Sequence, residues 1–206
     1  TPQKRRQGRY SLFIDDDFFI GLDEEVLYHG KLKVGQELNP DKLKEFVMRE
    51  EYTRAKQYVL FLLARRLYSC HEVHTKLVQK GYEVPTVEKL IADFVSKKYL
   101  NDRQFAESWI ETRLRLRPRG PVVLRQELVK KGIDREIIAE LLAPLQSTDE
   151  LVALARKTLL KKKNYQNESD PRKRKQKIYQ YLGQKGFSPD VIRETTRRIL
   201  EKSLEI

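Results

Sequence analysis

Three copies of one short motif constrain the fold of this chain more than any other feature of its sequence. Each copy is a Leu followed by Lys-Gly and a large apolar residue, within KLVQKGY, LVKKGI and YLGQKGF. The three glycines, Gly81, Gly132 and Gly186, are separated by 51 and 54 residues. A nearly constant period predicts a repeat architecture, in which each unit buries its apolar face against its neighbours.

The glycine of each motif follows a stretch with helical periodicity. It therefore predicts a helix end with a left-handed backbone, and the next apolar residue anchors the turn. Around each motif the apolar pattern predicts three helices. The predicted fold is mainly α, with three tandem three-helix repeats in an elongated, curved array after a small N-terminal β-hairpin. We expect a basic arm and hairpin over 1–38, a connecting helix over 39–52, and repeats over 53–100, 101–147 and 148–206.

The N-terminal segment has a different pattern. Lys4, Arg5 and Arg6 indicate a basic arm, and RYSLFIDDDFFIGL predicts a hairpin that turns at the three aspartates. A metal site at these aspartates is the alternative, but no partner ligands cluster with them. A short strand near Glu25–His29 and a helix from Asn39-Pro40 to about Glu51 are also expected.

Cap residues place the helix starts within the repeats. Ser69 with Glu72 forms an S-x-x-E capping box, and a proline follows the cap position at Gly120, Asp170 and Ser188. Pro118 predicts the end of the preceding helix. The remaining helix starts are predicted at Thr53, Thr86, Asn101 (with Gln104), Asp134 and Thr148.

Composition favours an anionic partner. The formal net charge is +12, and residues 151–206 hold 15 Lys or Arg against 6 Asp or Glu. Such a basic field indicates a polyanion or an acidic protein surface as the partner. We find no apolar run long enough for a membrane span and no signal peptide. The single cysteine, Cys70, fits a reducing, cytoplasmic location. The chain starts at Thr1 instead of Met, so residues upstream are conceivable.

We find no sequence motif typical of an enzyme or of a cofactor site. The sequence contains no P-loop, dinucleotide fingerprint or nucleophile elbow, so we expect no catalytic residue, metal or cofactor. Cys70 and His74 could share a helix face, but the capping box already explains this segment, and a structural zinc site needs four ligands. Trp109 could stack on a base; its position on an apolar stripe favours core packing.

Two groups of basic residues are candidates for binding an anionic partner, either a nucleic acid or an acidic protein surface. The first surrounds a helix end and the helix after it, where cations also suit the helix dipole. Arg113 and Arg117 are expected on one face of that helix. The second crowds the start of a helix, where cations oppose the dipole and repel one another, so a bound anion is favoured over a solvated face. The candidates are Arg113, Arg117, Arg119, Arg125, Lys130, Lys131, Lys161, Lys162, Lys163, Arg172, Lys173, Arg174, Lys175 and Lys177.

The middle repeat contains the segments YLND, FAESWI, RLRLRPRGP, LRQEL and KKGI, and the outer repeats contain SCHEVHTKLVQKGY and DPRKRKQKIYQYLGQKGF. The middle segments resemble the RecX family of regulatory proteins, and the outer ones resemble it more loosely. The resemblance covers about residues 53–202. Val122-Val123 departs from the pattern, because more basic character is expected at this place.

The resemblance implies a curved, all-helical, three-repeat modulator of the RecA recombinase. Such a protein binds RecA and the RecA–DNA filament, and it suppresses recombinase, ATPase and co-protease activity in DNA repair, recombination and the SOS response. We accordingly expect a monomeric, non-enzymatic regulator. The main alternative is a stand-alone DNA-binding protein, because a three-helix unit can place a helix in the major groove. An enzyme is the third hypothesis and would need a clustered site.

Overall fold

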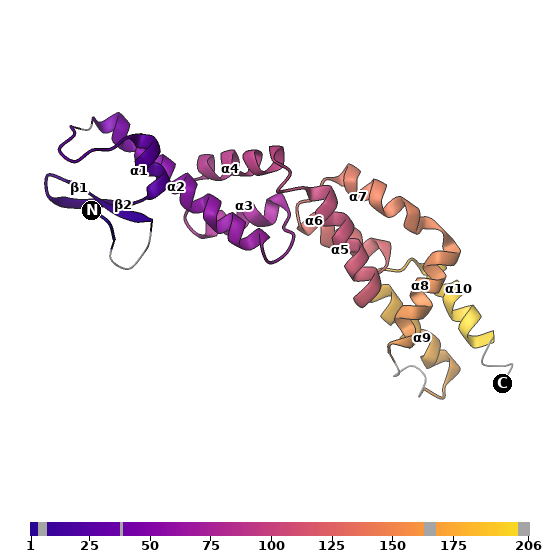
Figure 1. Cartoon of the computed structure of the whole chain (residues 1–206). Helices are drawn as coiled ribbons and strands as arrows, with labels where there is room; N and C mark the ends of the chain where they lie inside the picture. Colours follow the sequence, from indigo (N-terminus) through magenta and orange to yellow (C-terminus); the bar gives the residue numbers. More distant parts are fainter. Residues whose placement is uncertain (4–7, 38, 163–167, 202–206) are drawn as a thin grey trace. The chain divides into compact units, whose positions relative to one another are not determined.

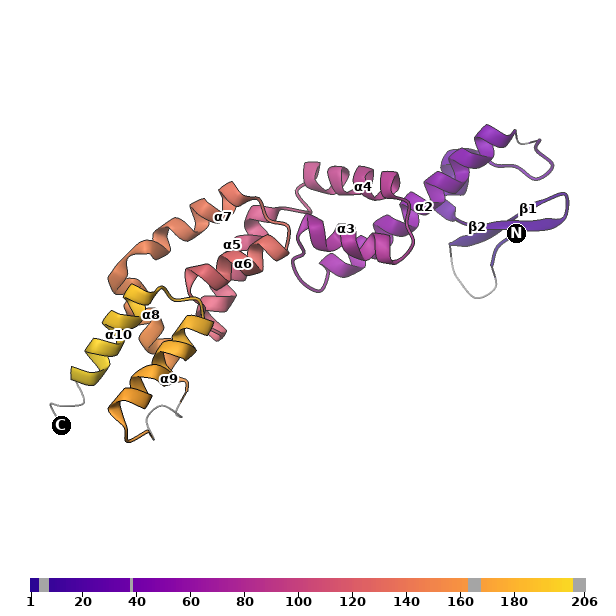
Figure 2. The same ribbon diagram turned by 180° about the vertical axis from the view of Figure 1, so that it is seen from behind.

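The computed structural model describes residues 1–3, 8–37, 39–162 and 168–201. The chain forms two compact units, Thr1–Leu100 and Asn101–Ile206 (Figures 1 and 2), which are described separately below. The first unit contains the hairpin and the first repeat, and the second contains repeats two and three. The mainly α fold with three three-helix repeats after a hairpin is confirmed.

The first unit begins with the predicted hairpin, β1 (Arg9–Ile14) and β2 (Asp17–Asp23). The strands are antiparallel, with a register irregularity after Leu12. Asp15 and Asp16 have φ values of 49° and 68°, the left-handed conformation that a two-residue hairpin turn requires. Because a short polar side chain tolerates this conformation, the aspartates serve as a turn.

The strand predicted near Glu25–His29 is wrong. This segment is a helix, α1 (Glu24–Gly30), which begins when the Asp23 side chain accepts a hydrogen bond from the Glu25 amide. Two acidic residues in the first turn suit the helix dipole. At its other end Gly30 lies against the Phe46 ring, which a Cβ atom would overlap.

The helix after Asn39 is longer than predicted. It runs without a break as α2 (Pro40–Leu63), and Asn39 caps it as expected by accepting from the Lys42 amide at 2.8 Å. The predicted helix start at Thr53 is wrong, because Thr53 is buried inside α2. One helix therefore serves both the hairpin and the first repeat.

A buried ion pair fastens the hairpin to α2. Glu50 is 1% exposed, pairs with Arg9 at 2.8 Å and accepts from the Asp23 amide at 2.5 Å. A small apolar cluster of Leu22, Val26 and Phe46 lies beside this pair. The hairpin is thus held by this ion pair, by the hydrogen bond from the Asp23 amide and by apolar burial together.

The first repeat is completed by α3 (Cys70–Gln79) and α4 (Val84–Ser96). The capping box of Ser69 and Glu72 is present, and Gly81 has φ +84°. The predicted cap at Thr86 is wrong: α4 begins two residues earlier. Glu51 of α2 supplies the hydrogen-bond acceptor for the start of α4. Its carboxylate accepts from the Glu83 amide at 2.7 Å and from the Thr86 hydroxyl at 3.0 Å.

In the second unit, the second repeat has the predicted starts and stops. Asn101 accepts from the Gln104 amide at 3.0 Å, and Gly120 with its following proline starts the next helix. Gly132 has φ +74°. The elements are α5 (Asp102–Leu116), α6 (Pro121–Lys130), α7 (Arg135–Leu142) and a short 3₁₀ turn, η1 (Ala143–Gln146).

The third repeat consists of α8 (Thr148–Leu160), α9 (Pro171–Gln184) and α10 (Pro189–Glu201). Gly186 has φ +87°, and the Phe187 amide donates to the Leu182 carbonyl at 3.2 Å, which closes the predicted turn. The core of this repeat includes Leu159, Ile178, Leu182, Phe187, Val191 and Ile192.

Repeats two and three meet through their backbones. The Gly120 amide donates to the Lys185 carbonyl at 2.7 Å, and a Cβ atom on Gly186 would lie 2.6 Å from the Val123 nitrogen. The motif glycine of repeat three is therefore both a helix end and a point of close approach. Among the described residues, no helix is long and apolar enough to cross a membrane.

Candidate nucleic-acid interface

Arg113, from the first basic group, is held in a contact between α5 and α6. Its Nε donates to Glu127 Oε2 at 2.7 Å, and its guanidinium lies 4.4 Å from the centre of the Trp109 ring. Glu127 also accepts from Trp109 Nε1 at 2.9 Å. The Arg113 side chain is only 24% exposed. It thus has a structural role, and Trp109 packs against the core as the apolar stripe indicated.

Arg117 does not share a helix face with Arg113, contrary to the prediction. The helix α5 ends at Leu116, and Arg117 has φ −136° and ψ 73°. Helical periodicity therefore stops before Arg117, which is exposed.

The first repeat shows what Arg117 lacks. At the equivalent place, 51 residues earlier, Arg66 binds Glu72 at 3.0 Å and lies 3.6 Å from the Tyr68 ring centre. Val123 takes the place of that glutamate in repeat two. Among the described residues no carboxylate pairs with Arg117. Relative to repeat one, Val123 thus replaces an acid and leaves Arg117 without a carboxylate among the described residues.

Arg119 occupies a more enclosed position. It lies between the buried residues Pro118 and Gly120 and is itself half-buried. Its Nε is buried and has no hydrogen-bond partner among the described residues. In the first repeat the equivalent residue is Tyr68, which is 9% exposed and belongs to the core. A guanidinium thus replaces an aromatic core residue here, and its buried Nε calls for a hydrogen-bond partner.

Two more of the predicted lysines, Lys161 and Lys162, follow the end of α8. Lys161 Nζ donates to the Leu116 carbonyl at 3.3 Å, and Lys162 Nζ lies 4.4 Å from the centre of the Tyr181 ring. Lys163 lies outside the described residues. The predicted lysines thus join the end of α8 both to the end of α5 and to α9.

Lys185 was missed as a candidate because its role in the repeat motif explained it fully. Its Nζ lies 5.1 Å from the same Tyr181 ring centre. The equivalent motif lysines also cover rings, Lys80 at 4.4 Å from Tyr58 and Lys131 at 5.0 Å from Trp109. Lys131 shares the Trp109 ring with Arg113, but Glu127 binds that arginine, whereas Lys185 and Lys162 share the Tyr181 ring without such a carboxylate among the described residues.

Arg119, Lys162 and Lys185 form what we call the junction cluster. Burial, the charge of Arg119 and the charge of Lys162 lower the pKa of Lys185. None of the three cations takes part in an ion pair with a described carboxylate. Like charges are therefore gathered at this junction without compensation.

The second basic group lies at the start of α9. Asp170 caps the helix by accepting from the amides of Arg172 and Lys173 at 2.8 and 3.4 Å, but no acidic residue follows in the first turn. Lys177 binds Glu168 at 2.5 Å, and this hydrogen bond is the main cause that lowers the pKa of the Glu168 carboxyl. Arg172, Lys173 and Lys175 are exposed, and Arg174 is half-buried.

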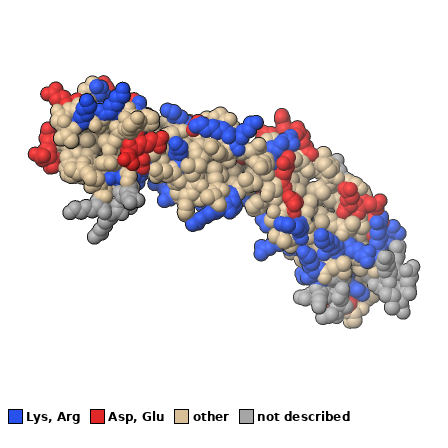
Figure 3. All heavy atoms as spheres, viewed as in Figure 1, with Lys and Arg blue, Asp and Glu red and all other residues tan. Residues whose placement is uncertain are grey.

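The remaining candidates lie on α6. Arg125 and Lys130 are exposed, and Lys131 is half-buried over the Trp109 ring. Figure 3 shows basic atoms gathered over the part of the second unit that α5, α8 and α9 form. In this unit the exposed basic side chains of α9 and the junction cluster are the strongest features for binding an anion.

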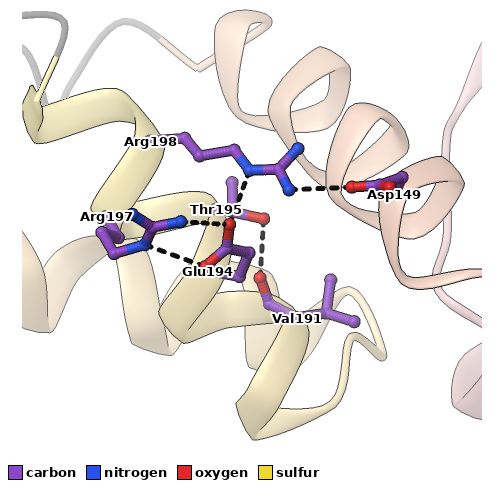
Figure 4. A network of polar contacts seen from close by, with 6 residues as sticks. All are labelled: Asp149, Val191, Glu194, Thr195, Arg197 and Arg198. Atoms are coloured by element: carbon purple, nitrogen blue, oxygen red, sulfur yellow. Dashed lines mark hydrogen bonds and ion pairs between the residues drawn. The ribbon is translucent and has the colours of Figure 1, made fainter.

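In contrast to the junction cluster, Arg197 and Arg198 of α10 are paired with carboxylates. Arg197 and Arg198 both bind Glu194, and Arg198 also reaches Asp149 of α8 at 2.8 Å (Figure 4). Hydrogen bonds from the two arginines lower the pKa of Glu194 to about 2. This network joins α10 to α8 and is a structural feature of the third repeat.

The cysteine and histidines near the first repeat motif have a structural explanation in the capping box of α3. Across the described part of the chain, no three His, Cys, Asp or Glu side chains are grouped so that they could hold a metal ion.

Four family descriptions match successive parts of the chain. The regulatory protein RecX N-terminal domain matches residues 1–39, and the first, second and third RecX three-helix domains match residues 55–94, 101–142 and 148–195. Together these matches extend over both units.

Whole proteins and solved structures agree. The regulatory protein RecX of Clostridioides difficile is 32% identical over 200 residues, which cover 96% of this chain and 92% of the relative. That of Clostridium perfringens (strain SM101) is 30% identical over 202 residues, with the same coverage. A crystal structure of regulatory protein RecX matches with a TM-score of 0.73 at 26% identity, covering 94% of this chain and 95% of that one. RecX from Lactobacillus salivarius matches with a TM-score of 0.64 at 27% identity, covering 73% of this chain and 97% of that one. The chain therefore belongs to the RecX family of regulatory proteins.

Proposed function

We propose that this chain is a non-enzymatic regulator that binds RecA and its filament on DNA. In this proposal it mainly inhibits the recombinase, ATPase and co-protease activities of RecA in DNA repair and recombination. It acts as a monomer in the cytoplasm. Membership of a family of regulatory proteins supports this proposal.

One structural observation carries the choice of binding surface. The start of α9 presents Arg172, Lys173 and Lys175 to solvent, at the helix end where the dipole disfavours cations. A chain selected only for stability would place acidic residues there. We infer that these side chains contact an anionic surface of the filament, either DNA phosphates or acidic residues of RecA.

The direct test is ATP hydrolysis by RecA on single-stranded DNA while this protein is titrated in. We expect inhibition at or below equal amounts of the two proteins. A full titration without inhibition would contradict the proposal.

Charge reversal at the start of α9 tests the surface itself. The variant R172E/K173E places acids in the first turn of α9, so we expect unchanged or slightly higher stability together with weaker inhibition of RecA. The variant K42E/K44E, in α2 of the first unit, makes the same change of charge on exposed side chains and is the control. Equal inhibition by both variants would remove this face from the proposal.

The alternative is a protein that binds DNA without RecA. The uncompensated cations of repeats two and three favour it, because phosphate contacts alone give sequence-independent affinity. Binding to naked DNA should then weaken steeply with salt. If inhibition of RecA persists at a salt concentration where binding to naked DNA is lost, the regulator function is favoured over this alternative.

A further inference from the structure

We propose that the junction cluster of Arg119, Lys162 and Lys185 is a binding site for one phosphate group of a nucleic-acid backbone, shared between repeats two and three. The identity of the ligand as nucleic acid rests on the proposed function. The presence of an anion site rests on the geometry of the second unit alone.

The cluster is assembled by backbone contacts between three segments that are distant in sequence. The hydrogen bond from the Gly120 amide to the Lys185 carbonyl, at 2.7 Å, places the loop before α6 beside the end of α9. The bond from Lys161 Nζ to the Leu116 carbonyl, at 3.3 Å, places the end of α8 beside the end of α5. Lys162 and Lys185 then lie over the same ring, that of Tyr181.

The electrostatics of the cluster lack a negative partner. Burial, together with the charges of Arg119 and Lys162, lowers the pKa of Lys185. In the described parts of the chain no carboxylate forms an ion pair with any of the three. The face of Tyr181 offers only the weak attraction of an aromatic ring. A phosphate group would supply both the charge and the acceptor oxygens.

Helix ends explain the two lysines of the cluster but not Arg119. Lys162 lies two residues after the C-terminal end of α8. Lys185 is at the C-terminal end of α9, where the dipole favours a cation. Arg119 is not in a helix, and its buried Nε has no partner among the described residues. Repeat one places an aromatic core residue, Tyr68, at the equivalent position. The guanidinium is therefore specific to repeat two, where planar N–H donors suit a phosphate.

The first test uses the full chain and a labelled oligothymidylate, without RecA. In fluorescence anisotropy we expect R119Q/K185Q to bind about tenfold more weakly than wild type, and the slope of log K against log salt to fall by about 0.7, as for one lost contact to a single strand. The control R135Q/K80Q removes two exposed charges, one of them the motif lysine of repeat one. Wild-type affinity in R119Q/K185Q, or an equal loss in the control, would overturn the assignment of this site to nucleic acid.

The second test needs no variant. Inorganic phosphate, compared with chloride at matched ionic strength, should raise the unfolding midpoint of the second unit within the wild-type full chain by several degrees, because a ligand of the native state stabilises it. An unchanged midpoint would overturn the anion site. If phosphate stabilises the protein while R119Q/K185Q binds oligothymidylate normally, the ligand is free phosphate and the assignment to nucleic acid is wrong.

These outcomes are separate from the proposed function. A protein that inhibits RecA although both tests fail keeps its regulatory role and loses this site. A protein that passes both tests and leaves RecA unaffected keeps the site and loses the regulatory role.

Discussion

The Gly120 amide donates a hydrogen bond of 2.7 Å to the carbonyl of Lys185, and this bond joins the start of α6 to the end of α9. Gly120 has no side chain at a point where a Cβ atom would overlap the Gly186 carbonyl oxygen. The two glycines therefore allow repeats two and three to approach through their backbones. The proposed phosphate site depends on the same contact.

Replacing Gly120 by alanine should destabilise the second unit. The added Cβ must displace backbone, so we expect a loss of about 1–3 kcal/mol. Urea unfolding can be followed by the fluorescence of Trp109, which lies in this unit and is the only tryptophan of the chain.

Gly183 provides the matched control for this change. It lies within α9 and has open space around its Cβ position, so G183A should stabilise the unit by up to about 1 kcal/mol. Equal effects of G120A and G183A would show that close approach at Gly120 is unimportant.

The contact between Glu127 and Arg113 should stabilise the second unit measurably. Both side chains are less than a quarter exposed, at 21% and 24%, and Glu127 also holds the Trp109 indole. We expect E127Q to cost about 1 kcal/mol and to shift the emission of Trp109. A double-mutant cycle with R113Q should show coupling, and strictly additive effects would contradict the contact.

The pH dependence of the α10 network follows from the lowered pKa of Glu194. Because that pKa is about 2 in the folded chain against an ordinary value of 4.5, ionised Glu194 stabilises the fold above about pH 4.5. This contribution is lost as the pH falls towards 2. E194Q should thus be less stable than wild type at pH 7, and the difference between them should shrink in acid. A difference that is independent of pH would contradict the assignment.

The Tyr52 phenol should titrate at a higher pH than an ordinary tyrosine. Burial and a 2.8 Å hydrogen bond to Asp93 raise its pKa to about 12, which favours the neutral phenol in the folded state. The resulting stabilisation is present below pH 10 and is lost as the pH rises through about 12. Ultraviolet titration of tyrosinate should show a late phase that Y52F removes. If Y52F leaves the late phase unchanged, the phase belongs to another tyrosine.

Local chemistry explains why so much of the fold was predictable. The capping box at Ser69, the prolines after Gly120 and Asp170 and the motif glycines act through neighbours in sequence, and all appear as predicted. The errors fall where a distant residue supplied the partner. The start of α4 shows this, since Glu51 of α2 accepts the bonds that a local cap at Thr86 was expected to make.

The candidate site was predictable only in part. Basic residues at the start of α9 are visible as a run in the sequence, and the net positive charge of repeat three follows from its numbers of basic and acidic residues. Whether a basic side chain is paired with a carboxylate cannot be predicted from the sequence, because ion pairs form between different helices. Arg113 is bound by Glu127, fourteen residues away, while Arg119 has no carboxylate partner among the residues that the structure describes.

The sequence by itself determined the repeat, its helix ends and the excess of positive charge, because these depend on periodicity, on backbone conformation at Gly81, Gly132 and Gly186, and on composition. Only the tertiary structure decided which cations are neutralised and which remain uncompensated. It also brought Lys185, a helix-end residue by sequence, beside Arg119. The reason is physical: helix ends are set by contacts within a few residues, whereas electrostatic compensation is set by distance in space.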